Sequence, residues 1–178
     1  LNLTGANTFS DGFTLNAGTV GIGNDAALGN GIVTINGGTI AALGEGEVGN
    51  DVDVNADFTI AGGADIDAVL SGDIDLSGGD ANHLITISNP GTTSISGDMT
   101  GGDFTKSGSG QLTLTGTNNF VNGVTVNEGL LRFNHANAIS ADDDLTLTGT
   151  GSVDINDDMV VDVLTGTGTG TIDISGNS

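Results

Sequence analysis

Residues 1–18 of this 178-residue chain are LNLTGANTFSDGFTLNAG, and residues 112–129 are LTLTGTNNFVNGVTVNEG. At an offset of 111, ten positions of the two stretches carry the same residue type, and in the first copy they are Leu1, Leu3, Thr4, Gly5, Asn7, Phe9, Gly12, Thr14, Asn16 and Gly18. The likeness continues more weakly, because residues 27–28 match 138–139 and, after one inserted residue, 33–35 match 145–147. We therefore assign two copies of one repeat to residues 1–40 and 106–153, with a divergent, Asp-rich stretch at 41–105.

A finer alternation of apolar and small polar residues predicts short β-strands. They are expected at Leu1/Leu3, Phe13/Leu15, Val20/Ile22, Val33/Ile35, Val52/Val54, Phe58/Ile60, Ile74/Leu76, Ile85/Ile87, Leu112/Leu114, Val124/Val126, Leu145/Leu147, Val153/Ile155 and Ile172/Ile174. Gly, Asn or Asp separates them, as turns require, and the spacing of about 20 residues between the second, fourth and fifth pairs suits one solenoid turn. We therefore predict an all-β fold, a single right-handed parallel β-helix (β-solenoid) of roughly eight turns with almost no helix.

Three Asn-Gly dipeptides, which begin at Asn30, Asn36 and Asn122, allow an alternative fold. Asn-Gly favours tight hairpin turns, so these sites are also compatible with an antiparallel β-sandwich. The solenoid explains the 32 glycines better, because its corners require positive φ angles in turn after turn.

The composition predicts a thin core. Six Phe are the only aromatic residues, while Val, Ile and Leu recur in alternation. The residues expected to face this core are Leu3, Leu15, Ile35, Val54, Ile74, Ile87, Leu114, Val126, Leu147 and Ile174.

The formal net charge of −21 comes from 23 acidic residues set against only Lys106 and Arg132. Such a chain repels nucleic acid and anionic lipid, so neither is an expected partner. The sequence has no apolar run long enough to span a membrane, which argues against membrane insertion. Without cysteine it forms neither disulfides nor thiolate metal sites.

Residues 106–120, KSGSGQLTLTGTNNF, and their continuation through Gly123, Val124, Val126, Asn127, Gly129 and Leu130 resemble the passenger-associated repeat of bacterial autotransporters. The first copy resembles it from Leu1 to Gly18 and again at residues 23–24 and 27–29. The resemblance implies a right-handed parallel β-helix that is secreted or lies on the surface of a Gram-negative-type, outer-membrane-bearing bacterium. In that family the repeat is structural and carries no catalytic residues.

Three acidic pairs, Asp51/Asp53, Asp65/Asp67 and Asp73/Asp75, each flank one apolar residue. Residues two apart in a strand share a face, so both carboxylates of a pair should point outward while the apolar neighbour points inward. They could simply form a solvated face, or they could make weak calcium contacts between turns, since Ca²⁺ prefers carboxylate oxygens. No other cofactor is expected.

Other chemistry is poorly supported by the residue types. Paired Asp residues can cleave glycans, but such sites also need basic or aromatic groups that hold the sugar, and here these are scarce. His83 and His135 lack partner spacing and are expected at the surface, and Asp142-Asp143-Asp144 is expected to be a solvated turn. The Thr-Gly alternation at 165–171 could order water and bind ice, although Thr is also a common polar strand residue.

We therefore expect a non-enzymatic structural segment that acts as a rigid rod, spacer or fibre-forming unit. The alternative is an adhesin whose exposed face binds host or biofilm glycan. Leu1 and Leu3 at one end, and Ile172 and Ile174 at the other, already match core positions without a capping segment. The expected partners are therefore a second copy, associated end to end, or a covalent continuation of the solenoid.

The charge gives the first test. Millimolar Ca²⁺ or high salt should raise the melting temperature, because the outward carboxylates repel one another along the rod. The measurement is a thermal melt in chelator, in Ca²⁺ and in NaCl. A melting temperature that is the same in all three would contradict both calcium bridging and charge repulsion.

Overall fold

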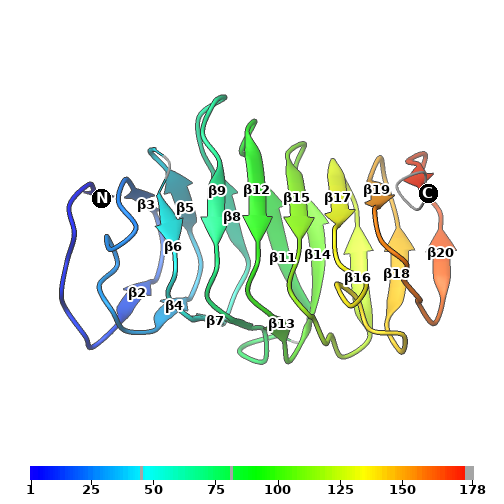
Figure 1. Cartoon of the computed structure of the whole chain (residues 1–178), viewed down its shortest axis with the longest axis horizontal. Helices are drawn as coiled ribbons and strands as arrows, with labels where there is room; N and C mark the ends of the chain where they lie inside the picture. The colour runs from blue at the N-terminus through cyan, green and yellow to red at the C-terminus, as the bar shows by residue number, and fades with distance from the viewer. Residues whose placement is uncertain (45, 81, 175–178) are drawn as a thin grey trace.

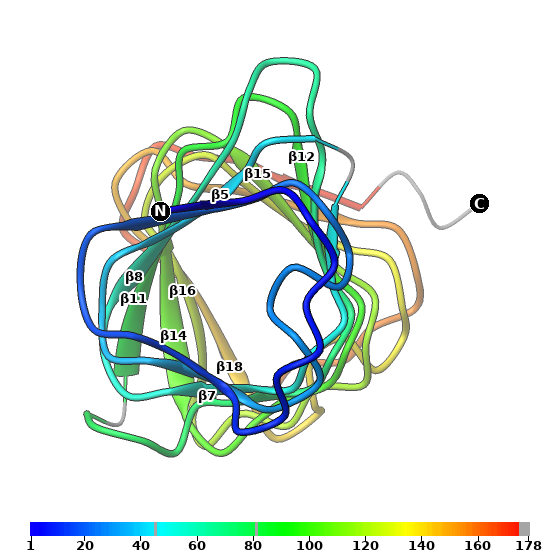
Figure 2. The same cartoon turned by 90° about the vertical axis from the view of Figure 1, so that its left-hand side faces the viewer.

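A computed structural model describes residues 1–44, 46–80 and 82–174 as a parallel β-solenoid of about eight turns. The turns stack along one axis, and the chain runs from one end of the rod to the other (Figure 1). Seen along this axis, the turns enclose one common core (Figure 2). The described residues form no α-helix and hence no helix able to cross a membrane.

Three parallel sheets form the walls of the rod. Sheet A has nine strands: β1 (Asn2–Leu3), β3 (Thr19–Ile22), β5 (Thr39–Ala42), β8 (Phe58–Ala61), β11 (Asn82–Ile87), β14 (Asp103–Ser107), β16 (Gly123–Val126), β18 (Asp144–Leu147) and β20 (Leu164–Gly166). Sheet B has five: β2 (Phe13–Leu15), β4 (Val33–Ile35), β7 (Val52–Val54), β10 (Ile74–Asp75) and β13 (Met99–Thr100). Sheet C has seven: β6 (Glu47–Val48), β9 (Ala68–Leu70), β12 (Thr92–Ile95), β15 (Gln111–Leu114), β17 (Leu130–Phe133), β19 (Ser152–Ile155) and β21 (Ile172–Asp173).

Every pairing between strands of the described residues is parallel and joins neighbouring turns, which confirms the solenoid and excludes the hairpin alternative. Asn36-Gly37 and Asn122-Gly123 lie at corners, where Gly37 and Gly123 adopt φ angles of 129° and 132°. At Gly123 a Cβ would lie 2.0 Å from the Asp144 carbonyl oxygen of the next turn. This corner therefore requires glycine for its backbone angle and for the close approach of the two turns.

The unequal lengths of sheets B and C have one cause, the loops of the two repeat copies. In the first copy the segments 5–11 and 24–30 lie where the wall of sheet C would continue, and that sheet begins only at β6. In the second copy the segments 117–122 and 135–142 lie where sheet B would continue, and that sheet ends at β13. Strands at equivalent positions of the two repeat copies therefore belong to different sheets. For example, β1 of the first copy is in sheet A, and the equivalent β15 of the second copy is in sheet C. The two copies are rotated by one wall about the axis.

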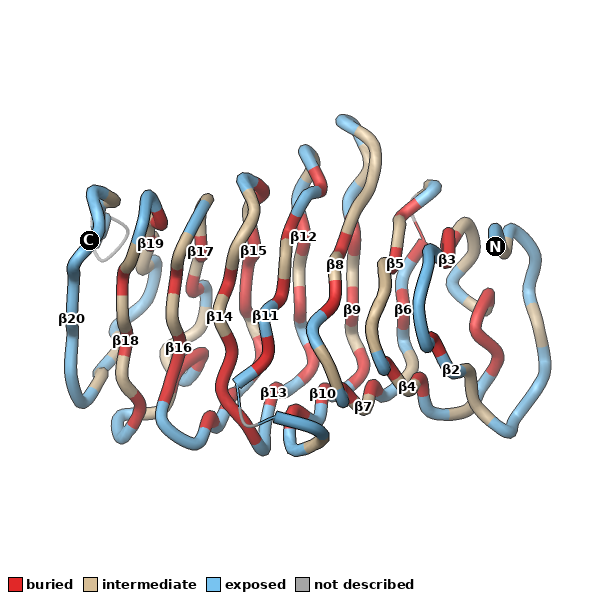
Figure 3. The backbone as a smooth tube through the Cα atoms, turned by 180° about the vertical axis from the view of Figure 1, so that it is seen from behind, coloured by how far each residue is buried: buried red, intermediate tan, exposed pale blue. Residues whose placement is uncertain are grey.

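The predicted core is correct at eight positions, where Leu15, Ile35, Val54, Ile74, Ile87, Leu114, Val126 and Leu147 are buried. Buried positions recur on successive turns along the rod (Figure 3). Leu3 is half-buried and packs against the core. The prediction for Ile174 is wrong, because this side chain is 65% exposed. It follows β21 in the outermost described turn, so no further described turn covers it.

The alternation along β16 predicts opposite effects for two adjacent residues. Val126→Asp buries a carboxylate at a position that is 0% exposed and should cost several kcal/mol, a large share of a typical folding free energy. Thr125→Asp places the same charge on the outer face and should change the stability by less than about 1 kcal/mol. Urea unfolding followed by circular dichroism measures both. Equal destabilisation by the two variants would contradict this register.

Candidate functional site

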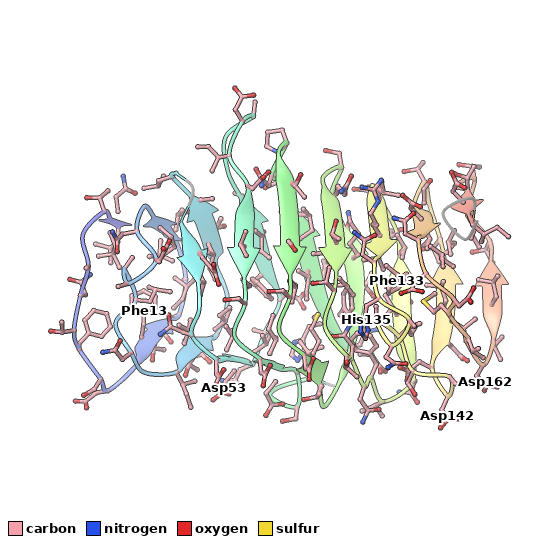
Figure 4. All side chains as sticks on the ribbon, viewed as in Figure 1. Phe13, Asp53, Phe133, His135, Asp142 and Asp162 are labelled. Carbon is pink, nitrogen blue, oxygen red and sulfur yellow. The ribbon has the colours of Figure 1, made fainter. Side chains whose placement is uncertain are left out.

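Two of the three predicted acidic pairs lie at the start of strands of sheet B and point outward, with Asp53 in β7 and Asp75 in β10. Asp51 and Asp53 flank buried Val52, and Asp73 and Asp75 flank buried Ile74. Asp53 and Asp75 are register partners on neighbouring turns. Asp53 and the loop residues Asp142 and Asp162 project from the outside of the rod (Figure 4).

The third pair, Asp65/Asp67, is not in a strand. It lies in the loop between β8 and β9, which projects beyond the wall (Figure 1). Its central residue, Ile66, is only half-buried. The expected alternation of a strand therefore does not apply to this pair.

The acids form a column of hydrogen-bond acceptors at the corner that leads into sheet B. Oδ1 of Asp51 accepts the N–H of Asp73 (3.1 Å), and Oδ1 of Asp73 accepts the N–H of Asp98 (3.0 Å). Oδ1 of Asp98 then accepts the N–H of Thr117 (2.7 Å). Each carboxylate thus satisfies a backbone donor of the next turn where no strand partner is available. At the neighbouring corner Asp67 does the same for the N–H of Thr92 (2.9 Å).

These contacts give the outward acids a structural role besides solvation. Hydrogen bonds from the hydroxyl and N–H of Ser77 lower the pKa of Asp75 and favour its charged form. Within residues 1–44, 46–80 and 82–174, no group of three or more acidic or histidine side chains is placed to hold a metal ion. Calcium bridging of the pairs stays a prediction for the thermal melt.

The two repeat copies build the same hydrogen-bonded loop around one asparagine, Asn7 or Asn118. In the first copy, the N–H and Nδ2 of Asn7 donate to the carbonyls of Ala26 (2.9 Å) and Ala27 (2.8 Å). In the second, the same groups of Asn118 donate to Asn137 (3.0 Å) and Ala138 (2.7 Å). The shared Asn of the motif therefore ties one loop to the equivalent loop one turn further on.

The tied loops fold into the rod. In the first copy Ala27 and Leu28 are buried, and in the second Ala138 and Ile139 take their places. The inward fold of the first copy is visible along the axis (Figure 2). A side-chain acceptor begins each loop, because Oδ1 of Asn24 accepts the N–H of Ala26 (3.0 Å) and Nδ1 of His135 accepts the N–H of Asn137 (3.1 Å).

Both histidines were expected at the surface, and for His83 this is wrong. His83 is 1% exposed, and its Nε2 lies 3.1 Å from the carbonyl oxygen of Leu76. It precedes Ile85 and Ile87 in the inward alternation of β11, which begins earlier than the sequence suggested. His135 is half-buried at the start of the loop.

Lys106 is fully buried, and sequence reasoning missed it. Its Nζ donates to the carbonyls of Gly108 (2.8 Å), Ser107 (3.3 Å) and Glu128 (2.8 Å), and so connects two turns. Burial lowers the pKa of Lys106 to about 8, although the Glu128 carboxylate opposes this shift. The signal was the alternation itself, because Lys106 stands two residues after buried Phe104.

The predicted solvated turn at Asp142-Asp143-Asp144 is wrong for its centre, because Asp143 is 2% exposed. Its Oδ2 accepts the N–H groups of Ser140 (3.0 Å) and Phe120 (3.4 Å). Burial raises the pKa of the Asp143 carboxyl, the nearby carboxylates of Asp103 and Asp142 add to the rise, and the two N–H donors oppose it.

Asp103, which is 9% exposed, holds the loop just after Phe120. Its Oδ1 accepts the N–H groups of Val121 (3.0 Å), Asn122 (2.6 Å) and Gly123 (3.1 Å). Its Oδ2 accepts Nδ2 of Asn122 (2.6 Å). Together, the carboxylates of Asp103 and Asp143 accept the backbone N–H groups of four consecutive residues, 120–123.

The fold and these loops define a parallel β-solenoid built from sequence repeats. Residues 1–22 and 104–133 match the family model of the passenger-associated transport repeat, and together they cover under a third of the chain. The match shows that these two stretches carry the repeat that the motif resembles. No curated protein and no solved structure matches the chain.

Removing the Asp103 carboxylate should destabilise the protein more than removing an acid from the column. Asp103→Ala leaves three backbone N–H donors and one amide without their acceptor, and we expect a loss on the order of 3 kcal/mol. Asp98→Ala, which removes the acceptor of one N–H, should cost about 1 kcal/mol. Urea unfolding compares the two. A smaller loss for Asp103→Ala than for Asp98→Ala would contradict the assigned role.

The buried Lys106 predicts an alkaline gain in stability. The pKa of Lys106 is about 8 in the folded chain, whereas a solvent-exposed lysine, as in the unfolded chain, has a pKa of 10.5. Between these two pH values the unfolded chain therefore binds more protons than the folded chain. The free energy of unfolding should therefore rise between pH 8 and 10.5, by about 3 kcal/mol.

The sequence suits this measurement, because it has no Tyr or Cys and no second Lys that would titrate in the same range. Urea unfolding at several pH values gives the slope, and Lys106→Met should remove it. A flat pH profile in the unsubstituted chain would mean that the three carbonyls keep the ammonium charged despite its burial.

Proposed function

We propose that this chain is a non-catalytic structural segment of a secreted or surface-exposed bacterial passenger, in which it serves as a rigid spacer. The observation that carries the proposal is the combination of a passenger-associated transport repeat with a continuous parallel solenoid. In such a rod each turn adds about 4.8 Å of length, so nine strands of sheet A extend it by about 40 Å.

The side-chain chemistry supports this role. The repeat motifs use Asn7 and Asn118 to hold loops together, and Lys106 to connect two turns. The acids of the column and Asp103 accept backbone N–H groups. The residues of the repeat motif and the acids outside it thus both contribute to the shape and rigidity of the rod.

An adhesin role is the second candidate, and one groove favours it. Beside the projecting loop between β8 and β9, a groove of about 600 Å³ crosses three turns and is lined by Asp67, Ser88, Pro90 and Gln111, among others. Its polar, largely uncharged lining suits a neutral glycan. A glycan array with the purified chain tests this role, and Gln111→Ala should weaken any specific binding.

Surface display tests the leading proposal. The chain, with an epitope tag at its N-terminus, is placed between a secretion signal and an autotransporter translocator barrel in a Gram-negative host. We expect the tag to be accessible to antibody on intact cells and the solenoid to resist added protease. The core variant Val126→Asp should lose that resistance. Retention of the unsubstituted chain inside the cell, or its rapid digestion outside, would refute a role as an exposed rigid spacer.

A further inference from the structure

Each inward loop leaves a groove on the outside of the rod, and the two grooves share one construction. The first has a volume of about 430 Å³ and is lined by residues 25–26, 29–32 and 49–51. The second has a volume of about 350 Å³ and is lined by residues 117–118, 136–137, 139–141, Asp158 and Val160. Residues 25, 26, 29 and 30 of the first correspond to 136, 137, 140 and 141 of the second at the repeat offset. Both volumes lie in the range of ligand-binding pockets.

Each groove combines an exposed aliphatic side chain with carboxylate. In the first groove Ile32 is 50% exposed, and Asp25 and Asp51 line the same space. In the second, Val160 is 65% exposed and Asp158 lines the space. An exposed branched aliphatic beside a carboxylate matches the two parts of a Lys or Arg side chain, an apolar stem and a cationic head.

The first groove is held in shape by hydrogen bonds to its lining. Nδ2 of Asn50 donates to the carbonyls of Gly29 (3.0 Å) and Gly31 (2.8 Å) and fixes the floor. Oδ1 of Asp25 accepts the N–H of Glu47 (3.0 Å), which orients that carboxylate. Preorganised acceptors lose less entropy when a ligand binds.

The charge of the chain identifies the kind of occupant. The net charge is −21, and both basic side chains are already engaged, Lys106 with carbonyls and Arg132 with Asp154 at 2.7 Å. Neither Lys106 nor Arg132 therefore pairs with the carboxylates of the grooves. A cationic ligand would also be attracted by the field of the whole rod.

The geometry points to the two grooves as docking sites for Lys or Arg side chains of an extended basic segment in a partner protein. This inference goes beyond the spacer role and does not depend on it. In each groove the aliphatic stem packs on Ile32 or Val160, and the charged head meets Asp25 and Asp51 or Asp158. Because the repeat copies are rotated by one wall, the grooves lie on different walls and should bind independently, two segments per chain.

The test uses the ¹⁵N-labelled chain and an acetylated, amidated hexapeptide with one arginine among alanines, at physiological salt. We expect saturable amide shifts confined to residues near Ile32, Asn50 and Val160. The same peptide with citrulline, which has nearly the same shape but no charge, should bind at least tenfold more weakly.

Matched variants separate docking from general attraction to an acidic rod. Asp25→Asn with Asp51→Asn should abolish the shifts of the first groove only, and Asp158→Asn those of the second only. Asparagine keeps an Oδ1 acceptor for the N–H of Glu47, so the fold should persist, and the unchanged spectrum elsewhere checks this. Asp80→Asn, in an exposed loop outside both grooves, is the control.

Ile32→Ser and Val160→Ser test the apolar contact, and each should weaken binding in its own groove. Shifts spread over all acidic surfaces, equal losses with Asp80→Asn, or equal binding of the citrulline peptide would each overturn the proposal. So would the absence of any saturable shift. None of these outcomes bears on whether the chain is a rigid spacer.

Discussion

The structure depends on one constraint, that the backbone N–H and C=O groups of each turn must find partners on the turns beside it. Within the three sheets this is automatic, because parallel strands of neighbouring turns lie in register. At the corners and loops the ladders are interrupted, and an unpaired buried donor would cost about 1–3 kcal/mol. Short polar side chains that reach the adjacent turn supply the missing hydrogen-bond partners.

The same constraint explains much of the unusual composition. Asp at the corner into sheet B accepts the N–H of the next turn, as Asp51, Asp73 and Asp98 do. Asn at the corner from sheet B into sheet A forms its own ladder, in which Nδ2 of Asn36 donates to Oδ1 of Asn16 (2.8 Å) and Nδ2 of Asn55 to Oδ1 of Asn36 (2.9 Å). The high negative charge is thus partly a consequence of how the turns are joined.

The sequence predicted the strands and the core well, because both follow from alternation within a few residues. Strand centres such as Val124/Val126 and the parallel stacking were correct. The wall that each strand occupies could not be predicted, since it depends on how much of a turn each loop takes up. This is why the second copy is rotated by one wall although its sequence matches the first.

The candidate site residues were harder to predict, because their contacts come from neighbouring turns. Asp143 and Lys106 belong to polar stretches, yet both are buried against partners about 20 residues away, such as Phe120 and Glu128. His83 was missed because β11 begins earlier than the run of apolar residues indicates. For Ile174 the alternation continued, but no described turn covers it. Only the outward orientation of the acidic pairs at the start of β7 and β10, Asp51/Asp53 and Asp73/Asp75, followed from local pattern alone.

The central claim is that the turns stack in parallel as one rigid rod, and an inter-spin distance tests it most directly. The chain has no cysteine, so Thr39→Cys and Thr146→Cys accept spin labels at two outward positions of sheet A without competition. Five strand steps separate β5 from β18 in that sheet, which places the two backbones about 24 Å apart along the axis. Double electron–electron resonance should give one narrow distribution near this value. A broad distribution, or a narrow one at a clearly different distance, would contradict the stacked rigid solenoid.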